Sequence, residues 1–402
     1  MVYRKFHDMD ISHLGMGCMR LPKQNAEGEA VDVAKAEELI AKAQESGINY
    51  YDSAYRYHGG ESELIMGKAL SRFKRETYHI ATKMPGHMMS YQDGKYTFTG
   101  MLSGAPPRTP AEVFEEQLEK CRVDYFDLYL LHNVSENSFA FYTNEEIGII
   151  PLLLEQKKKG RIRHLGFSSH GRSETLEKFL DYSDSRFSPG IFEAVQIQLN
   201  YLDWTVQNAR RKYECLTARG IPVIAMEPVR GGRLASFSEE SGAEAVLKAL
   251  RPNDTAASWA VRYVKSLPNV QVVLSGMSSL GQLEDNLKTI EEPGPLSEKE
   301  YEAIREVVSK LANLVPCTSC RYCCEECPQK LDIPRLISME NEIKNGRETI
   351  WKAINFTLSG MKESELPSSC VDCGNCKQVC PQNIDVPEIM RSLAEGIKRN
   401  RV

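Results

Sequence analysis

The sequence predicts an α/β chain in which a (β/α)8 barrel is followed by a small, mainly helical domain rich in cysteine. Eight β-rich runs alternate with amphipathic helical patterns as far as about residue 290. A Pro/Gly/Glu-rich stretch at 291–300 ends this pattern, and two groups of four cysteines follow it. We therefore expect a TIM-type barrel over 1–290, a linker and helix over 291–316, and a separate domain over 317–402.

The β-rich runs are short and apolar, as expected of parallel strands buried inside a barrel. They are 13–19, 48–54, 78–85, 125–132, 162–169, 194–201, 221–228 and 270–276, of which the first is the weakest. Helical patterns lie between them, for example at 32–46, 110–122 and 254–266. A doubly wound sheet is the competing arrangement, but no Gly-x-Gly-x-x-Gly turn follows the first run.

A duplicated cysteine motif defines the C-terminal domain. Each copy reads Cys-x2-Cys-x2-Cys-x3-Cys-Pro, and the tail at 327–334 returns 53 residues later at 380–387. This spacing is typical of two 4Fe-4S clusters, in which the fourth cysteine of each copy binds the cluster of the other copy. The predicted ligand sets are Cys317, Cys320, Cys323 and Cys380 for one cluster and Cys370, Cys373, Cys376 and Cys327 for the other. Zinc is the alternative, but eight cysteines are more than one tetrahedral ion requires.

The repeat also selects between two adjacent cysteines. Either Cys323 or Cys324 could be the third ligand of the first copy. The 53-residue shift takes Cys323 to Cys376 but takes Cys324 to Lys377, so Cys324 is predicted not to bind a cluster. The segment between the copies, 335–366, has helix-compatible patterns and no alternating strand, which predicts a mainly helical domain.

Four side chains near the predicted strand ends form a chemically complementary set. The C-terminal strand ends of a (β/α)8 barrel open into one mouth, where reactive groups are expected. The four are Asp52 and Tyr57 after the second run, Lys83 at the third and His132 at the fourth. Carbonyl reduction by hydride needs such groups, because the oxygen gains negative charge and requires a proton donor and a hydrogen-bond partner.

Each of these residues has a predicted role. We expect Lys83 to lower the pKa of Tyr57, because a neighbouring ammonium favours the phenolate. Asp52 would keep Lys83 charged, and His132 would orient the substrate oxygen. Any one of the four has a structural explanation by itself, such as a capping Asp or a surface Tyr. Four complementary groups on three successive strand ends favour a catalytic site.

Several segments resemble the aldo-keto reductase family of NAD(P)H-dependent (β/α)8 oxidoreductases. They are 47–63, 80–85, 128–133, 165–170 and 283–287, and the resemblance covers roughly residues 10–290. With its cysteine-rich end, the chain resembles the branch fused to a C-terminal 4Fe-4S ferredoxin-type domain. The resemblance implies that Asp52, Tyr57, Lys83 and His132 are the catalytic tetrad.

The same resemblance implies contacts with a nicotinamide cofactor. The nicotinamide amide would contact Ser168, Ser169 and Gln196, the pyrophosphate would lie near Gly231 and Gly232, and the adenine side would contact Glu284 or Asp285, with Asn286. This chain departs from the family pattern at two of the positions expected near the cofactor. The seventh run ends in Met226-Glu227-Pro228-Val229 where an aromatic residue often stacks on nicotinamide. The loop 276–279 lacks the Arg or Lys that pairs with a 2'-phosphate, so NAD(H) and NADP(H) are both left open.

Residues 86–109 form a long loop at the expected barrel mouth. Two interpretations stay open for it: a substrate lid, or a segment that packs against the cysteine-rich domain. The apolar and aromatic side chains that would line a substrate pocket are Met88, Met89, Tyr91, Tyr96 and Phe98.

Composition excludes several classes of partner. A net charge of −5 leaves no basic footprint for nucleic acid. The sequence has no apolar run near the length of a bilayer span and no signal-like N-terminal segment, so no membrane association is expected. Thiolate-ligated clusters and free thiols fit a reducing compartment, which predicts a cytoplasmic protein.

The leading hypothesis is an NAD(P)H-dependent oxidoreductase that interconverts a small carbonyl compound and its alcohol. The alternatives are an electron-transfer protein that links the barrel to an external ferredoxin or other redox protein, and a nucleotide-binding redox sensor. Nicotinamide moves two electrons as hydride whereas a 4Fe-4S centre moves one, so direct coupling usually needs a flavin. A flavin is unsupported, since no flavin fingerprint is recognisable.

Overall fold

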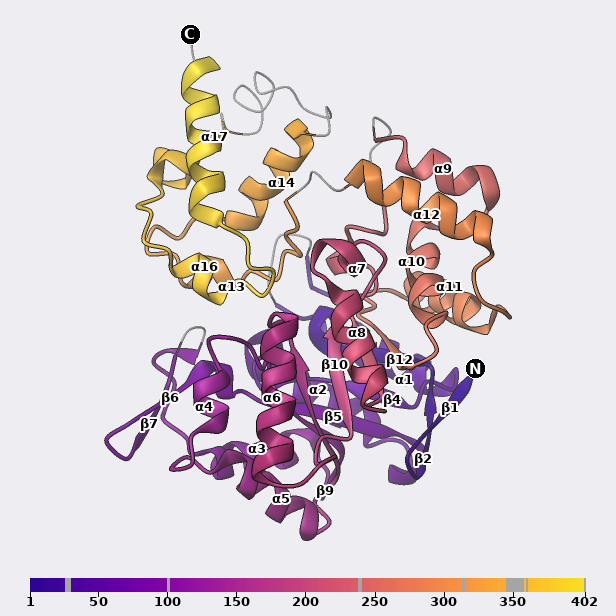
Figure 1. Ribbon diagram of the computed structural model, residues 1–402, viewed down its shortest axis with the longest axis vertical. Helices are drawn as coiled ribbons and strands as arrows, with labels where there is room; N and C mark the ends of the chain where they lie inside the picture. Colours follow the sequence, from indigo (N-terminus) through magenta and orange to yellow (C-terminus); the bar gives the residue numbers. More distant parts are fainter. Residues whose placement is uncertain are drawn as a thin grey trace. The chain divides into compact units, whose positions relative to one another are not determined.

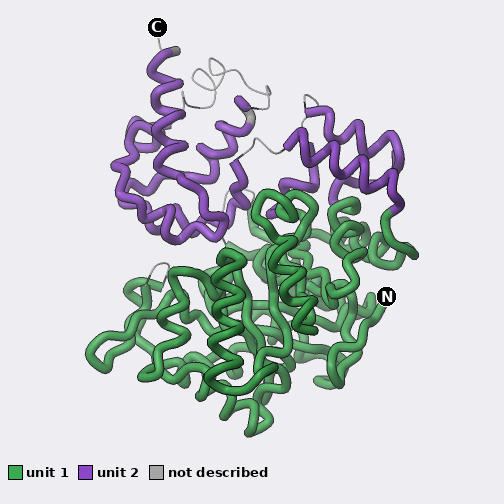
Figure 2. The backbone as a smooth tube through the Cα atoms, in the orientation of Figure 1, with its two compact units in different colours: residues 1–229, 258–296 green, residues 230–257, 297–402 purple. Residues whose placement is uncertain are grey.

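The computed structural model describes residues 1–25, 30–99, 102–237, 241–311, 315–344, 358 and 361–400. They form two compact units (Figure 2). The first unit comprises Met1–Val229 and Ser258–Leu296, and the second comprises Arg230–Ala257 and Ser297–Val402. The first holds the tetrad predicted from the sequence, and the second holds the duplicated cysteine motif.

The first unit is built on a closed barrel of eight parallel strands (Figure 1). In barrel order the strands are β3 (Leu14–Gly17), β4 (Tyr50–Asp52), β5 (His79–Met84), β8 (Phe126–Leu131), β9 (Ile162–Ser169), β10 (Ala194–Gln198), β11 (Val223–Met226) and β12 (Val270–Ser275), and β12 pairs with β3. Barrel order follows chain order, as expected when each strand is followed by a crossover helix. The predicted barrel is confirmed, including the weak first run.

Helices surround the strands, and several begin at side chains that satisfy their free N–H groups. The principal helices are α1 (Val33–Glu45), α2 (Glu61–Leu70), α3 (Pro110–Cys121), α5 (Ile149–Lys158), α6 (Ser173–Arg186), α8 (Ala209–Ala218), α10 (Ala256–Lys265) and α11 (Leu280–Glu291), with the short α4 (Phe139–Thr143) and α7 (Asp203–Val206) between them. A capping box formed by Thr109 and Glu112 starts α3, and Pro110 occupies its first position. Both features specify a helix N-terminus from local sequence.

An N-terminal β-hairpin precedes the barrel and was not predicted. Its strands, β1 (Tyr3–Phe6) and β2 (Met9–Ser12), pair antiparallel. Phe6, Met9 and Ile11 from the hairpin share one buried apolar cluster with side chains of the barrel strands, such as Leu128 and Ile224. The hairpin therefore packs against the barrel interior.

The long loop 86–109 is not structureless. It contains a second antiparallel hairpin, β6 (Met89–Gln92) with β7 (Lys95–Phe98). The Tyr91 hydroxyl donates to Glu146 at 2.9 Å, and the Phe98 ring stacks on Tyr55 with 5.9 Å between centroids. Two residues of the loop, 100 and 101, lie outside the described part.

The described parts of the second unit are helical. Its helices are α9 (Ala243–Leu250), α12 (Glu298–Leu311), α13 (Tyr322–Glu325), α14 (Ile333–Lys344), α16 (Asn375–Val379) and α17 (Val386–Asn400). This agrees with the predicted mainly helical domain, although residues 345–357 and 359–360 of the predicted helical segment lie outside the described residues. None of the described helices combines the length and apolar character that a membrane span requires.

Candidate functional site

The four predicted catalytic residues lie at neighbouring strand ends of the barrel. Asp52 is the last residue of β4, Lys83 is next to last in β5, and His132 directly follows β8. Tyr57 begins the 3-10 turn η2 (Tyr57–Gly60) that follows β4. Because β4, β5 and β8 are adjacent and parallel, their C-terminal ends meet at one rim of the barrel.

Asp52 and Lys83 form a buried ion pair. Each residue is 1% exposed, and the Lys83 ammonium donates to the Asp52 carboxylate and, at 2.7 Å, to the Ser53 carbonyl. Burial raises the pKa of Asp52 above its ordinary value, and the Lys83 charge opposes that shift. The lysine is therefore held in place by the carboxylate it neutralises.

Tyr57 lies beside both Lys83 and His132. The Lys83 nitrogen is 5.0 Å from the centroid of the Tyr57 ring, and the His132 ring meets that ring edge-on at 5.9 Å. Burial raises the pKa of Tyr57 well above that of free tyrosine, and the Asp52 and Glu227 carboxylates raise it further. The predicted lowering by Lys83 is wrong for the chain as it stands, because burial and two carboxylates act against it.

His132 is buried against a second histidine that sequence reasoning missed. Burial lowers the pKa of His132 well below its ordinary value, and the nearby His87 and Lys83 lower it further. His87, in the turn η4 (Gly86–Met88), meets the His132 ring at 4.4 Å between centroids. His132 is therefore a neutral imidazole at pH 7, with one N–H donor and one acceptor. In the sequence, His87 follows Lys83 by four residues, and this spacing could have indicated that His87 lies near the site.

The residues expected to contact nicotinamide lie on adjoining strands. The Ser168 hydroxyl accepts from the Asn133 N–H at 2.8 Å, which leaves its own O–H free to donate. The Ser169 hydroxyl already donates to the Val134 carbonyl at 2.7 Å. The Gln196 side chain is 1% exposed, and its amide oxygen is buried with no hydrogen-bond partner among the described residues. An unpaired buried acceptor and a free hydroxyl suit a carboxamide ligand.

Among the described residues, no contact joins the other predicted cofactor residues to the tetrad. Gly231 and Gly232 belong to the 3-10 turn η6 (Arg230–Gly232), where their φ values are 65° and 96°, and this turn lies in the second unit. Glu284 is exposed on α11. Asn286 is buried and donates to Ser275 at the end of β12 at 2.9 Å, so it joins α11 to the barrel.

Arg20 is another residue that the sequence did not single out. It ends the 3-10 turn η1 (Cys18–Arg20) after β3, and it is the cation that lowers the pKa of Tyr57 against the effect of burial. A Cβ placed on Gly276 would lie 3.3 Å from the Arg20 side chain, so this arginine packs on the loop that follows β12. No local sequence signal links a residue after the first strand to the eighth.

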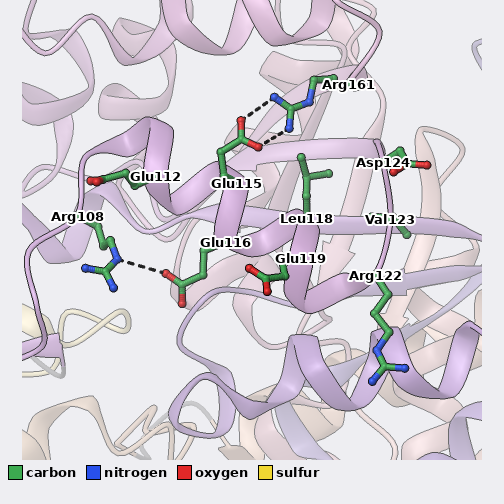
Figure 3. A pocket seen from close by; sticks show the side chains of 10 residues that line it. All are labelled: Arg108, Glu112, Glu115, Glu116, Leu118, Glu119, Arg122, Val123, Asp124 and Arg161. Carbon is green, nitrogen blue, oxygen red and sulfur yellow. Dashed lines mark hydrogen bonds and ion pairs between the residues drawn. The ribbon is translucent and has the colours of Figure 1, made fainter.

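An open groove of about 900 Å³ lies along α3, outside the barrel mouth (Figure 3). Arg161 forms two hydrogen bonds to Glu115, at 2.5 and 2.6 Å, and Arg108 lies 3.8 Å from Glu116. No tetrad residue lines the groove. Two of its arginines are paired with glutamates of the same groove, and the groove is not part of the predicted carbonyl-reduction site.

The two cysteine motifs adopt the same local backbone. Left-handed φ values occur between the ligands of the first copy at Ser319 (56°) and Arg321 (66°), and 53 residues later at Asp372 (54°) and Gly374 (77°). They also recur at Lys330 and Asn383, at 54° and 53°. Residues other than glycine rarely adopt these φ values, so their recurrence shows that the two copies share one local fold.

The predicted exchange of the fourth cysteine agrees with the positions of the thiols. Cys317, Cys320, Cys323 and Cys380 line one pocket. Burial raises the pKa of Cys376 to about 11, and the neighbouring Cys370, Cys373 and Cys327 raise it as well. Cys327 therefore lies near the second set and Cys380 near the first. Four sulfur donors in each group suit a 4Fe-4S cluster.

Comparisons with known proteins identify both domains. The model of the aldo/keto reductase family matches residues 13–309, and that of the 4Fe-4S dicluster domain matches residues 316–384. An uncharacterized oxidoreductase, YqkF of Bacillus subtilis (strain 168), is 27% identical over 326 residues, covering 74% of this chain and 93% of the relative. L-galactose dehydrogenase of Arabidopsis thaliana is 26% identical, covering 75% and 93%.

Solved structures give the same result. The holo form of aldo-keto reductase AKR11C1 from Bacillus halodurans matches with a TM-score of 0.57 and 26% identity, covering 76% of this chain and 96% of that one. These matches confirm the predicted barrel and the predicted fusion to an iron-sulfur domain. The chain is an oxidoreductase that belongs to the aldo/keto reductase family and carries a C-terminal 4Fe-4S dicluster domain.

Proposed function

We propose that the barrel reduces a small aldehyde or ketone to its alcohol, using Asp52, Tyr57, Lys83 and His132. The observation that carries this proposal is the buried Asp52–Lys83 pair beside the rings of Tyr57 and His132. When bound, NADH or NADPH supplies the hydride for the carbonyl carbon. The side chains of the tetrad then act on the carbonyl oxygen.

Tyr57 gives its proton to that oxygen as negative charge develops. Its raised pKa means that the hydroxyl holds its proton until the substrate becomes a stronger base. The Lys83 ammonium stabilises the resulting phenolate, and Asp52 keeps the ammonium in position. His132, as a neutral imidazole, provides an N–H that orients the substrate oxygen.

Ser168 and Gln196 are proposed to bind the nicotinamide carboxamide. The free Ser168 O–H would donate to the amide oxygen, and the unpaired Gln196 oxygen would accept from the amide N–H. On the family resemblance, the other proposed contacts with the nicotinamide cofactor are Gly231, Gly232, Glu284 and Asn286. Ser169 is proposed to contact the nicotinamide carboxamide through its backbone. The loop Gly276–Ser279 has no cation of its own, but Arg20 packs on it, so NADH and NADPH both stay proposed. One relative, 25% identical over 56% of this chain, is the NADH-specific methylglyoxal reductase of Escherichia coli (strain K12).

Two 4Fe-4S clusters are proposed for the C-terminal domain, with the ligand sets predicted from the repeat. A second candidate function, exchange of single electrons with a ferredoxin or another redox protein, is favoured by one observation. Cys373 is exposed and its neighbour Val371 is 56% exposed, so a cluster bound there would lie close to the surface. None of the twelve cysteines forms a disulfide, and from this together with the proposed thiolate-ligated clusters we infer a reducing compartment such as the cytoplasm.

One preparation tests both parts of the proposal. Protein purified anaerobically should show a broad absorption shoulder near 400 nm and contain about eight iron atoms per chain, the content of two 4Fe-4S clusters. The same protein should oxidise NADH or NADPH when supplied with short aldehydes or ketones. Absence of the shoulder contradicts the clusters, and flavin bands near 370 and 450 nm would favour electron transfer. Absence of turnover with a panel of carbonyl compounds contradicts the reductase and favours a redox sensor.

A further inference from the structure

Two histidines and a carboxylate meet at the end of the barrel opposite the tetrad. His7 lies in the two-residue turn between β1 and β2, His164 is the third residue of β9, and Glu193 directly precedes β10. One ligand atom from each of these side chains lies within 4.8 Å of the other two. The three residues form the histidine cluster, which lies where β9 and β10 begin, whereas the tetrad lies where its strands end.

His7 is held by its backbone in an orientation that suits a metal ligand. It is the first residue of the hairpin turn, with a φ of 52°, a position where glycine or asparagine is usual. Its Nε2 lies 3.1 Å from the Glu193 carbonyl oxygen, so Nε2 carries the proton and donates. No hydrogen bond to its Nδ1 is found in the part of the chain that the structure describes. The exposed ring therefore keeps one lone pair to offer, as metal-binding histidines do when the other nitrogen donates to a carbonyl.

His164 is oriented by a carboxylate that is not itself one of the clustered ligands. The ring is buried, with its Nε2 2.7 Å from Asp8 Oδ1 and its Nδ1 2.9 Å from Glu193 Oε1. Asp8 can accept from the Nε2–H while Nδ1 turns a lone pair toward Glu193. A carboxylate partner of this kind fixes the ring and makes the histidine a stronger ligand. The His7 ring stacks on the His164 ring, with 4.7 Å between centroids and 18° between planes.

The Glu193 carboxylate divides its two oxygens between different partners. Oε2 accepts from the Lys157 ammonium and, at 3.1 Å, from the Leu165 N–H, while Oε1 faces His164. Lys157 opposes the binding of a second cation, and the charges of the Asp8 and Glu193 carboxylates offset it.

The spacing of the cluster is close to that of a coordinated ion. Bonds of zinc to nitrogen and carboxylate oxygen are about 2.0–2.2 Å long, which at a tetrahedral angle separates two ligand atoms by about 3.4 Å. The 2.9 Å between His164 Nδ1 and Glu193 Oε1 would therefore widen by about 0.5 Å as an ion replaces the proton that the two atoms share. Without the ion, the ring shares protons with both of its carboxylate partners.

We propose that the histidine cluster binds one Zn²⁺ ion, with a ring nitrogen of His7, Nδ1 of His164 and Oε1 of Glu193 as ligands and with Asp8 orienting His164. Two imidazoles and a carboxylate suit zinc, whereas Mg²⁺ and Ca²⁺ prefer oxygen ligands alone. The ion acts on stability, because its ligands join the N-terminal hairpin to the beginnings of two barrel strands. This site is independent of the proposed reductase function and of the cysteine motifs.

The test is equilibrium dialysis of the iron-loaded holoenzyme against micromolar Zn²⁺, with metal content measured by mass spectrometry. Cysteines outside the iron-sulfur ligand sets also bind zinc, so variants are compared with the wild type. The wild type should hold one zinc per chain more than His7→Asn, in which asparagine keeps the left-handed backbone but removes the imidazole. His164→Gln should lose the same ion. The matched control is His58→Asn, because His58 has a φ of 53° and lies outside the cluster, and this variant should keep the ion.

Two further measurements separate ligands from the orienting group. Asp8→Asn should still bind the ion at saturation, but about 10- to 100-fold more weakly, because Asp8 acts through His164. Zn²⁺, but not Mg²⁺, should raise the Tm of the wild type, and a chelator should reverse the rise. His7→Asn should show no such rise.

Three results would overturn the inference. They are a wild type that binds no zinc, equal zinc contents in the wild type and His7→Asn, and retention of the ion in His164→Gln. Equal contents would assign the bound zinc to thiols. The His7 side chain is exposed, so His7→Asn is expected to fold, and its Tm in the presence of chelator checks this.

Discussion

Asp52 and Lys83 lie on adjacent strands of the barrel and form an ion pair from which solvent is almost entirely excluded. Lys83 also faces the Tyr57 ring, so the pair joins the barrel interior to the proposed proton donor. Two consequences follow, one for stability and one for catalysis. Both can be measured by changing one side chain at a time.

Replacing Lys83 by Met should destabilise the protein by about 3–5 kcal/mol, because the Asp52 carboxylate is left buried without its counter-charge. The double variant Asp52→Asn/Lys83→Met should recover much of this loss, since it removes the unpaired charge. Denaturant unfolding of the two single variants and the double variant measures the coupling. Additive losses would show that the two side chains do not stabilise each other.

Replacing Tyr57 by Phe should lower kcat for carbonyl reduction about 100- to 10,000-fold, the usual contribution of a general acid. NADH affinity should change little. The matched control is Tyr55→Phe, because Tyr55 is a neighbouring tyrosine whose hydroxyl donates to Glu116 at 2.9 Å instead of facing Lys83. Near wild-type turnover in Tyr57→Phe would assign the proton donor to another group, with His132 first.

Replacing Cys323 by Ser should remove one cluster, whereas Cys324→Ser should keep the iron content close to that of the wild type. Cys323 shares a pocket with Cys317, Cys320 and Cys380, and Cys324 has no counterpart in the second copy. Iron and acid-labile sulfide analysis of anaerobically purified variants measures the difference. Equal iron loss in the two variants would contradict the assignment from the repeat.

Adding NADH anaerobically should leave the clusters oxidised and silent in electron paramagnetic resonance. A hydride donor transfers two electrons together, a 4Fe-4S centre accepts one, and the sequence has no recognisable flavin motif to mediate. Dithionite serves as the positive control and should reduce the clusters. A reduced-cluster signal from NADH alone, within catalytic turnover times, would make electron transfer the leading function.

Stability should depend on pH through His164 and Glu193, next to the N-terminal hairpin. The His164 ring nitrogens contact Glu193 at 2.9 Å and Asp8 at 2.7 Å. Burial lowers the pKa of His164, but the hydrogen bonds to Glu193 and Asp8 outweigh it and the net pKa is raised above 6.5. Its stabilisation is therefore fully present below pH 6.5 and is lost as the pH rises through the folded value.

Glu193 acts in the opposite direction. Burial raises its pKa, but hydrogen bonds from His164 and Lys157 outweigh burial and lower it from 4.5 to about 2. Its stabilisation is present above pH 4.5 and is lost as the pH falls toward 2. Thermal unfolding between pH 5 and 9 should show an alkaline decline that His164→Gln removes. A decline of the same size in His164→Gln would contradict this assignment.

The sequence by itself determined the barrel and the helical C-terminal domain, and it predicts how the cysteines divide into two ligand sets. Strand-end chemistry was readable because parallel strands of a barrel all end at one rim, so Asp52, Lys83 and His132 are brought together by topology alone. The cysteine ligands could be predicted because the two copies of the motif can be compared with each other position by position. The left-handed turns at Ser319 and Asp372 lie at the same position in the two copies.

Only the tertiary structure decided what depends on packing between distant segments. The pKa of Tyr57 is raised because burial and the Asp52 and Glu227 carboxylates outweigh the Arg20 guanidinium, and burial is not visible in a motif. His87 reaches His132 because Tyr142 fixes both backbones from a third segment. Local periodicity and spacing describe neighbours along the chain, whereas desolvation and ring contacts depend on which segments the fold brings together.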